Sequence, residues 1–230
     1  GRPVRTEFEV IVVDNASTDG TREMLAEKYP RVVTILNDDN RRWAGGNNQG
    51  AAAAAGEYLF FLNSDTLIGE GVLDLFVRFM DEHPEAALAG CRLHNPDGTL
   101  QRSCRGFPDI LNLISESFFL YQMFPGSRTF GRYHMTNFSH DAVREVDMVA
   151  GAALMVRNNV FADVGLFDES FHFYGEEVDY CYRAKARGYR TFFFPGAVIV
   201  HYGGGSPQPR QSYYENLFDG LRHFLVKHHR

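Results

Sequence analysis

The feature that most constrains the fold is a short apolar run that ends in polar residues and leads into a helix. Residues 8–13 are apolar and rich in β-branched side chains, and Asp14 and Asn15 follow them. This pattern is typical of a buried parallel strand with polar groups at its carboxyl end. Residues 17–21 then supply N-cap side chains for a helix that ends before Pro30. The N-terminal segment therefore predicts a strand, a turn and a helix.

The same unit recurs along the next part of the chain. Residues 32–36 predict a second strand, residues 43–55 a helix, and residues 58–62 a third strand. Strands that alternate with helices favour an α/β fold with a parallel central sheet. Because such sheets bind ligands at the carboxyl ends of their strands, we expect Asp14 and Asp65 to face one crevice.

The sequence pattern changes in the second half of the chain. Residues 95–98 form an Asn-Pro-Asp-Gly hairpin turn, and residues 106–140 are aromatic with scattered proline and glycine, which predicts a loop-rich segment. The elements predicted after this segment are a strand over 146–156, helices over 158–164 and 176–187, a strand over 191–194 and a last helix over 212–228.

Composition narrows the class of protein. With 230 residues, one compact domain is the default. The 23 Lys and Arg minus 29 Asp and Glu give a net charge of −6 without a basic run, so nucleic acid is not expected as a partner. Three cysteines are too few for a disulfide framework and fit a reducing cytosol. No apolar stretch approaches the roughly 20 residues that cross a bilayer, so we expect a soluble or peripheral, cytoplasmic chain.

Three groups of polar residues are candidates for chemistry. Asp65 follows the third strand, and an isolated Asp at such a position is more often a turn or helix cap than a metal ligand. The acidic residues at 176, 177 and 179 open a helix, and the helix dipole accounts for one or two of them. It does not account for the glycine-flanked aromatic loop before them. His201 ends a strand-like run and precedes a Gly-rich turn, which suits either a hydrogen-bonded structural role or close approach of a ligand.

The order of these motifs is more specific than any one of them. They are residues 12–21, 40–50, 62–66, 97–101, 151–155, 175–179 and His201. Together they closely resemble family 2 inverting glycosyltransferases of the GT-A fold, within them the rhamnosyltransferase-like branch. The resemblance covers nearly the whole chain. It implies a Rossmann-like, mostly parallel central sheet flanked by helices.

The resemblance also assigns a donor site. Asp14 matches the acid that hydrogen-bonds the N3–H of a uracil or thymine base. Asp65 matches the last Asp of the D-x-D motif, which holds a divalent cation on the donor diphosphate, and His201 matches a histidine that completes the metal site in some members. Mg²⁺ or Mn²⁺ suits such an oxygen-rich site. The other positions that match nucleotide-sugar-binding residues are Asn15, Asn40, Arg42, Gly45, Gly46, Asn47, Asn48, Asn63 and Ser64.

The catalytic residues come from the acidic helix start. Glu177 occupies the position of the family's catalytic Asp, so the resemblance implies that it is the general base, with a side chain about one methylene longer. Glu176 precedes it, and Asp179 is the alternative base or a positioning residue. The implied reaction is a single displacement with inversion, in which a carboxylate takes a proton from an acceptor hydroxyl.

Two positions depart from the family pattern. Relatives begin with a strand and a helix before the strand at residues 8–13, so a unit of about 30 residues is expected to be missing, and with it a central strand. Arg42 stands where the family has glycine. Its guanidinium either contacts a donor phosphate or is solvated.

The predicted organisation is a single domain over 1–230: a nucleotide-sugar-binding half (1–100), an acceptor and catalytic half (101–210) and an amphipathic helix (211–230). That helix either docks on the core or touches an anionic membrane. The implied function is transfer of a sugar, rhamnose favoured, from a dTDP- or UDP-sugar to a glycan or lipid-linked acceptor in cell-surface polysaccharide synthesis. The alternatives are a non-catalytic nucleotide- or sugar-binding remnant and an unrelated doubly wound enzyme. The last lacks support because no G-x-G-x-x-G turn or P-loop follows a strand.

Overall fold

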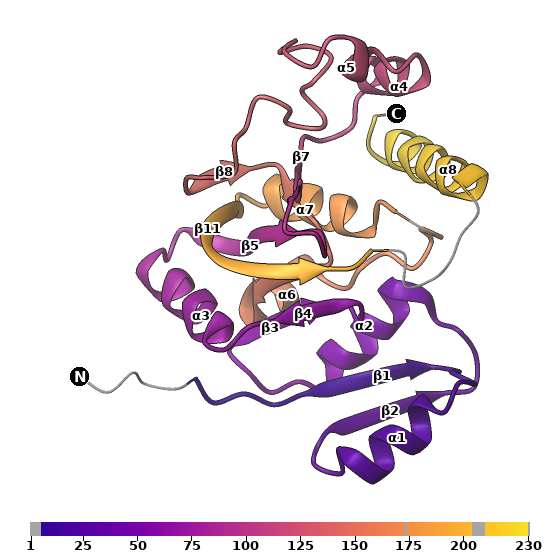
Figure 1. The fold of residues 1–230 in the computed structure, drawn as a ribbon, viewed down its shortest axis with the longest axis vertical. Coiled ribbons are helices and arrows are strands. Elements are labelled where there is room, and N and C mark those ends of the chain that lie inside the picture. The colour runs from indigo at the N-terminus through magenta and orange to yellow at the C-terminus, as the bar shows by residue number, and fades with distance from the viewer. Residues whose placement is uncertain (1–5, 173, 204–209, 230) are drawn as a thin grey trace.

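The computed structural model describes residues 6–172, 174–203 and 210–229, and its fold is α/β (Figure 1). The N-terminal elements are β1 (Ile11–Asn15), α1 (Thr21–Lys28), β2 (Val33–Asn37), α2 (Arg42–Ala53) and β3 (Tyr58–Leu62). Each lies within three residues of its predicted bounds. The strands β1 and β2 pair in parallel, from Ile11 opposite Val33 to Asn15 opposite Asn37.

A larger sheet forms the centre of the molecule. Its strands follow the order β3-β10-β5-β11-β4, with β6 paired to β5 and β8 paired to β11. The strands β3, β5 and β11 run in one direction, and β10 lies antiparallel between β3 and β5. The elements after β3 are β4 (Thr66–Ile68), α3 (Val72–Glu82), β5 (Ala86–His94), β6 (Leu100–Gln101), β7 (Cys104–Arg105), α4 (Ile110–Ser117), α5 (Leu120–Met123), β8 (Arg144–Val146), β9 (Met148–Val149), β10 (Ala153–Arg157), α6 (Asn158–Val164), α7 (Glu176–Ala186), β11 (Arg190–His201) and α8 (Arg210–His228).

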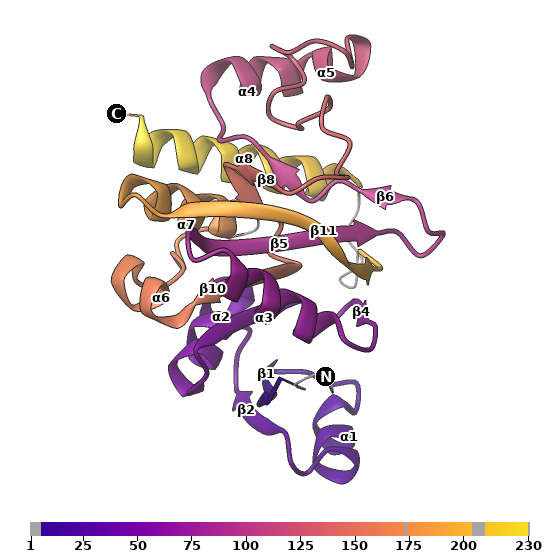
Figure 2. The same cartoon turned by 90° about the vertical axis from the view of Figure 1, so that its left-hand side faces the viewer.

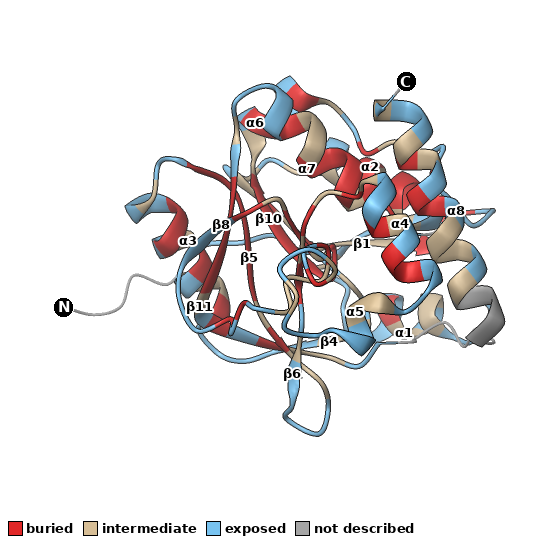
Figure 3. Cartoon of the chain, turned by 90° about the horizontal axis from the view of Figure 1, so that it is seen from above, coloured by how far each residue is buried: buried red, intermediate tan, exposed pale blue. Residues whose placement is uncertain are grey.

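Two apolar clusters cover the two faces of this sheet. On one face, Phe76 and Met80 of α3 pack against Phe194 of β11. On the other, Phe161 of α6 and Tyr180 of α7 stack with their ring centroids 5.5 Å apart. The strands β5 and β10 are therefore almost wholly buried, and β11 is buried over residues 191–194 (Figure 3). This layered core holds the strand ends that carry the polar residues.

The pair β1–β2 is a separate sheet. No ladder joins β1 to β3 in the part of the chain that the structure describes. Instead, a cleft of about 2120 Å³ is lined by residues of both strands and continues past the carboxyl ends of β1, β3 and β11. It lies centrally in the fold, where the resemblance places the family's first strand.

The second half differs in detail from the sequence prediction. The strand predicted over 146–156 is divided into β8, β9 and β10, because a bend at Asp147 and a turn at 150–152 interrupt it. The strand predicted over 191–194 extends to His201 through an irregularity after Phe194. The loop-rich segment contains the helices α4 and α5. Among the described helices, none combines the length and apolar character needed to span a bilayer.

Candidate active site

Four acidic or basic side chains from different elements meet at the cleft. Asp14 lies near the end of β1, Asp65 follows β3, His201 ends β11, and Glu177 lies in the first turn of α7. The expectation that the strand ends share one crevice is thus confirmed. The cleft combines a buried carboxylate, a carboxylate–imidazole pair and a pair of glutamates.

Asp14 is held rigidly and keeps one acceptor free of protein partners. Its side chain is almost fully buried, and Oδ1 accepts hydrogen bonds from Arg22 Nε at 2.5 Å and from the Ser17 amide at 3.2 Å. Burial pushes the pKa of this carboxyl upward, but the hydrogen bonds from Ser17 and Arg22 outweigh burial and lower the pKa below its usual value. Oδ2 is buried without a hydrogen-bond partner among the described residues. A buried acceptor of this kind requires a donor, and a base N–H fits.

Asp65 and His201 converge, as expected from their strand ends. Asp65 Oδ1 lies 3.2 Å from His201 Nε2, and Gln101 Oε1 lies 2.6 Å from His201 Nδ1. The Tyr202 amide also donates to the Asp65 carbonyl at 2.9 Å, which fixes the two strand ends together. A second hydrogen bond on a ligating imidazole orients the ring, and this is the usual arrangement in metal sites.

The pair fits a hard divalent cation that is completed by substrate. A carboxylate and an imidazole supply two ligands, and no group of three or more His, Cys, Asp or Glu side chains with metal-binding geometry exists within the described ranges. Mg²⁺ commonly binds through one or two carboxylates together with phosphate oxygens and water. The open side of the pair faces the cleft, so a diphosphate can supply the missing oxygens.

Two adjacent glutamates open α7 and have raised pKa values. Burial, together with the charge of Glu177, raises the pKa of Glu176 to about 7, although the positive charge of Arg42 offsets part of this rise. Burial also raises the pKa of Glu177, and hydrogen bonds from the backbone amides of Glu177, Gly175 and Gly151 oppose it. Both side chains line the cleft. A carboxylate with a raised pKa that backbone amides hold in place is suited to general-base catalysis.

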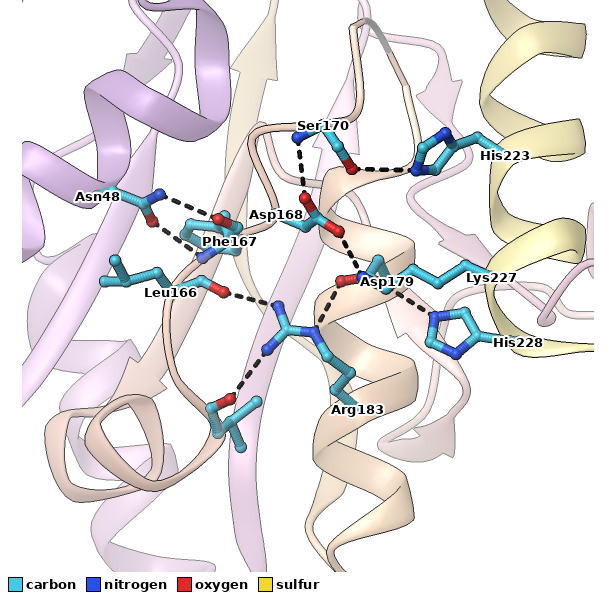
Figure 4. Close-up of polar contacts among 11 residues, drawn as sticks. Asn48, Leu166, Phe167, Asp168, Ser170, Asp179, Arg183, His223, Lys227 and His228 are labelled. Atoms are coloured by element: carbon cyan, nitrogen blue, oxygen red, sulfur yellow. Dashed lines mark hydrogen bonds and ion pairs between the residues drawn. The ribbon is translucent and has the colours of Figure 1, made fainter.

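Asp179 lies on the other side of α7, away from the cleft. It is fully buried, and its carboxylate binds Arg183 Nε at 2.7 Å, Lys227 Nζ at 2.6 Å and His228 Nε2 at 2.7 Å (Figure 4). Lys227 and His228 belong to α8. Asp179 is not among the residues that line the cleft, and two helix positions turn it about 200° from Glu177. Its contacts make it a positioning residue that joins α8 to α7.

Three residues predicted to bind the nucleotide-sugar donor meet at the start of α2: Asn15, Asn40 and Arg42. Arg42 has a φ of 59°, in the left-handed region that favours glycine, which is the residue the resemblance expects there. Asn40 Oδ1 accepts from the Arg42 amide at 2.8 Å, and Asn15 Nδ2 donates to the Arg42 carbonyl at 3.1 Å. The left-handed turn is thus held from both sides. It brings the Arg42 charge toward Glu176.

The other residues of α2 that were predicted to bind the nucleotide-sugar donor have different surroundings. Gly46 and Asn47 line the cleft. Gly45 lies against the side chains of Arg41 and Glu169, which leave little room for a Cβ atom. Asn48 is buried: it accepts from the Phe167 amide at 2.9 Å and donates to the Phe167 carbonyl at 3.0 Å. Gly45 and Asn48 therefore join α2 to the loop before α7 and do not line the cleft.

The predicted pair Asn63 and Ser64 lines the cleft beside Asp65. Asn63 Oδ1 accepts a hydrogen bond from Trp43 Nε1 at 2.9 Å. The indole ring lies against Gly151, where a Cβ atom would come within 2.7 Å of it. Trp43 therefore links the D-x-D position to the turn that hydrogen-bonds Glu177.

Sequence reasoning missed several residues that complete the cleft. Arg22 binds Asp14, Gln101 binds His201, and Arg105 lines the cleft and lowers the pKa of Glu177 through its charge. Gln101 lies within a motif that contributed to the resemblance, but nothing in its spacing predicts contact with a histidine 100 positions away. Nothing in the sequence around Arg22 predicts that it contacts Asp14 eight positions earlier.

Comparison with known sequences decides the family. Residues 4–147 match the family described as Glycosyl transferase family 2. The chain belongs to this family. The glycosyltransferase is 27% identical over 212 residues to the N-acetylglucosaminyl-diphospho-decaprenol L-rhamnosyltransferase of Mycobacterium tuberculosis H37Rv, covering 87% of this chain and 67% of the relative. It is 30% identical over 202 residues to the O-antigen biosynthesis protein RfbC of Myxococcus xanthus, covering 86% of this chain but 15% of that protein.

Solved structures support the fold of the glycosyltransferase. The mannosyltransferase PcManGT of Pyrobaculum calidifontis, in complex with GDP-Man and Mn²⁺, has a TM-score of 0.60 at 19% identity and matches 95% of this chain and 54% of its own. S. aureus TarS also has a TM-score of 0.60, at 18% identity over 96% of this chain and 34% of its own. The GT-A fold expected from the sequence is confirmed. The chain spans about half or less of these solved proteins.

Proposed function

We propose that this glycosyltransferase transfers a sugar, with rhamnose favoured, from a dTDP- or UDP-sugar to a glycan or lipid-linked acceptor, with inversion, in cell-surface polysaccharide synthesis. The observation that carries the proposal is the single cleft that Asp14, Asp65, His201 and Glu177 line together. The sugar and the acceptor class are supported by the similarity to the mycobacterial N-acetylglucosaminyl-diphospho-decaprenol L-rhamnosyltransferase.

The Asp14 end of the cleft supports a pyrimidine base. Its buried Oδ2 acceptor, without a partner among the described residues, matches the N3–H of uracil or thymine. Arg22 and Ser17 hold the carboxylate in its ionised form, so it acts only as an acceptor. A guanine N1–H presents a similar donor, so a donor screen that includes GDP tests the choice.

The Asp65–His201 pair supports a bound divalent cation. When bound, such a cation would offset the charge that develops on the leaving diphosphate. Asp65 and His201 would hold it, and Gln101 would keep the imidazole oriented for it. Arg42 at the start of α2 also lines the cleft and supplies a second positive charge there.

Glu177 supports the base role. Its raised pKa brings its basicity closer to that required near neutral pH, and the backbone amides of Gly175 and Gly151 fix its carboxylate. It would accept the proton of the acceptor hydroxyl as the oxygen attacks the anomeric carbon. Attack from the face opposite the diphosphate inverts the configuration at that carbon.

The test is transfer from dTDP-rhamnose, compared with UDP- and GDP-sugars, to a polyprenyl-diphospho-N-acetylglucosamine acceptor, with Mn²⁺ or with EDTA. We expect product only with a pyrimidine donor and the cation. Donor binding without transfer or hydrolysis under any condition would favour the alternative, a nucleotide-sugar-binding remnant. Equal transfer in EDTA would refute the metal-dependent mechanism.

A further inference from the structure

The helices α4 and α5 expose apolar side chains where a folded protein normally buries them. Seven large apolar residues within a segment of 15 positions are exposed, and we call them the apolar patch: Ile110, Leu111, Ile114, Phe118, Phe119, Met123 and Phe124. Ile110, Phe118 and Met123 are 69%, 66% and 66% exposed. Exposed large apolar side chains that gather on neighbouring short helices often mark an interaction site.

The helix α4 is amphipathic, but it buries its polar face and exposes its apolar face. Its polar residues Asn112, Ser115 and Glu116 are buried, whereas Ile110 and Ile114 on the opposite face are exposed. The buried side has specific partners: Glu116 Oε1 lies 2.5 Å from His134 Nε2, and Asn112 forms a capping box with Asp109. These contacts fix the orientation of the helix. The outward direction of the apolar face is therefore built into the structure.

The patch occupies one end of the molecule, beside α8 and at the opposite end from α1 (Figures 1 and 2). It is also next to the cleft, since Arg105 and Pro108, just before α4, and Tyr133 and His134, which lie behind it, line the cleft. The patch therefore lies on the outer side of α4, and the cleft begins on its inner side.

Charge distinguishes a membrane from other partners. The whole chain has a net charge of −6, yet residues 117–140 contain no Asp or Glu and include Arg128 and Arg132, both exposed. Of the two acids nearest the patch, Glu116 is buried against His134, and Asp109, the N-cap of α4, pairs with Arg132 at 3.2 Å. Arg128 is therefore the exposed cation that would face anionic headgroups. An apolar surface with phenylalanine, leucine and arginine fits the boundary between acyl chains and anionic headgroups.

We propose that the apolar patch docks on an anionic lipid bilayer and so places the cleft at the membrane surface. The expected alternative, the basic end of α8, is already occupied: Lys227 and His228 bind Asp179, and Lys227 also binds Asp168. The purpose of this docking, delivery of a lipid-linked acceptor to Glu177, rests on the proposed function. The docking itself requires neither donor nor acceptor.

The test is co-sedimentation of the purified chain with vesicles of phosphatidylglycerol and phosphatidylcholine, and with vesicles of phosphatidylcholine alone. We expect binding to the anionic vesicles and weaker binding to the neutral ones. Replacing Ile110 and Phe118 together by Asp removes two apolar side chains from the interface and should weaken binding about 100-fold. Met123→Glu on α5 should weaken it about 10-fold, and Arg128→Gln about 5-fold on anionic vesicles only.

The matched control is Tyr29→Asp, an exposed aromatic residue at the far end of the molecule, which should leave vesicle binding unchanged. Circular dichroism and a donor-induced thermal shift verify that each variant is folded. The proposal is overturned if the wild-type chain does not bind vesicles. It is also overturned if the patch variants bind as well as the wild type, or if light scattering shows that they only dissociate a dimer. Failure of sugar transfer alone would refute the proposed function and leave the vesicle result intact.

Discussion

At the scale of single residues, Glu177 and Glu176 divide one buried site between two roles. Glu177 is held by backbone amides, and Glu176 faces the charge of Arg42. Glu177→Gln removes the proton acceptor but keeps the shape of the side chain. We expect transfer to fall by about 10²- to 10⁴-fold with donor affinity nearly unchanged. Calorimetry with the donor and initial rates of transfer measure the two effects. A variant with near-normal turnover would remove Glu177 from the mechanism.

Glu176 predicts a dependence of stability on pH. Its pKa is about 7 in the folded chain against 4.5 for the free side chain, so the folded state binds more protons between these values. The free energy of unfolding therefore falls as the pH rises from about 4.5 to 7, by on the order of 3 kcal/mol at most. Glu176→Gln should reduce this decrease and leave the part that Glu177 contributes, whereas Glu27→Gln on the exposed face of α1 should not change it. Urea unfolding across the pH range measures it, and identical slopes for wild type and Glu176→Gln would contradict the assignment.

Substitution of Asp14 and of Asp65 should lower donor affinity with different dependence on Mn²⁺. Asp65→Ala removes a cation ligand and should abolish the Mn²⁺-dependent part of donor binding. Asp14→Ala removes a hydrogen bond to the base, worth about 0.5 to 1.5 kcal/mol, or about 3 when the charge contributes. That loss should be equal with and without Mn²⁺. Calorimetric titrations of both variants in Mn²⁺ and in EDTA test this, and parallel losses would show that the two residues do not act separately.

At the scale of elements, the ion-pair cluster around Asp179 joins α8 to α7. Asp179→Asn leaves Arg183 and Lys227 without their shared buried carboxylate, and losing one partner of such a cluster costs about 3 to 5 kcal/mol. We expect α8 to lose protection in hydrogen exchange together with this loss of stability. Asp219→Asn is the control, since its pair with Arg222 in α8 is exposed and contributes less than about 1 kcal/mol. Equal effects of the two variants would mean that the cluster does not anchor the helix.

The sequence predicted those elements whose pattern is local. The strand over 58–62 has the predicted bounds, because a short aromatic and leucine run between turn residues specifies it. The helix α3 was missed because it begins after a left-handed glycine without a side-chain cap, although its buried residues Val72, Phe76, Phe79 and Met80 recur at helical spacing. The helix α4 could not be found in this way because it buries its polar face. The sequence predicts only part of the difference between Glu177 and Asp179. Helical periodicity separates their directions, but only the contacts of α8 show which one is bound by cations.

At the scale of the whole molecule, the cleft is formed by residues from both ends of the chain, so donor binding should stabilise the entire fold. At a donor concentration of about 100 times Kd, the gain is about 2.7 kcal/mol, or roughly 5 to 10 °C in Tm. We expect this shift with dTDP or UDP in Mn²⁺, a smaller one in EDTA, and little with ATP as control. Equal shifts for all three nucleotides would indicate an unspecific phosphate site.

The separation of β1 from β3 has a consequence for how the chain behaves in solution. The edges of both strands that face the cleft carry backbone N–H and C=O groups outside any ladder of the described residues, and free strand edges are templates for further strands. Phe8 and Val10, just before β1, are exposed beside one of them. Chains at high concentration should therefore pair edge to edge and form aggregates rich in β-structure, even though each is folded. A short peptide with strand propensity, added in excess, would compete for the same edges and keep the chains apart.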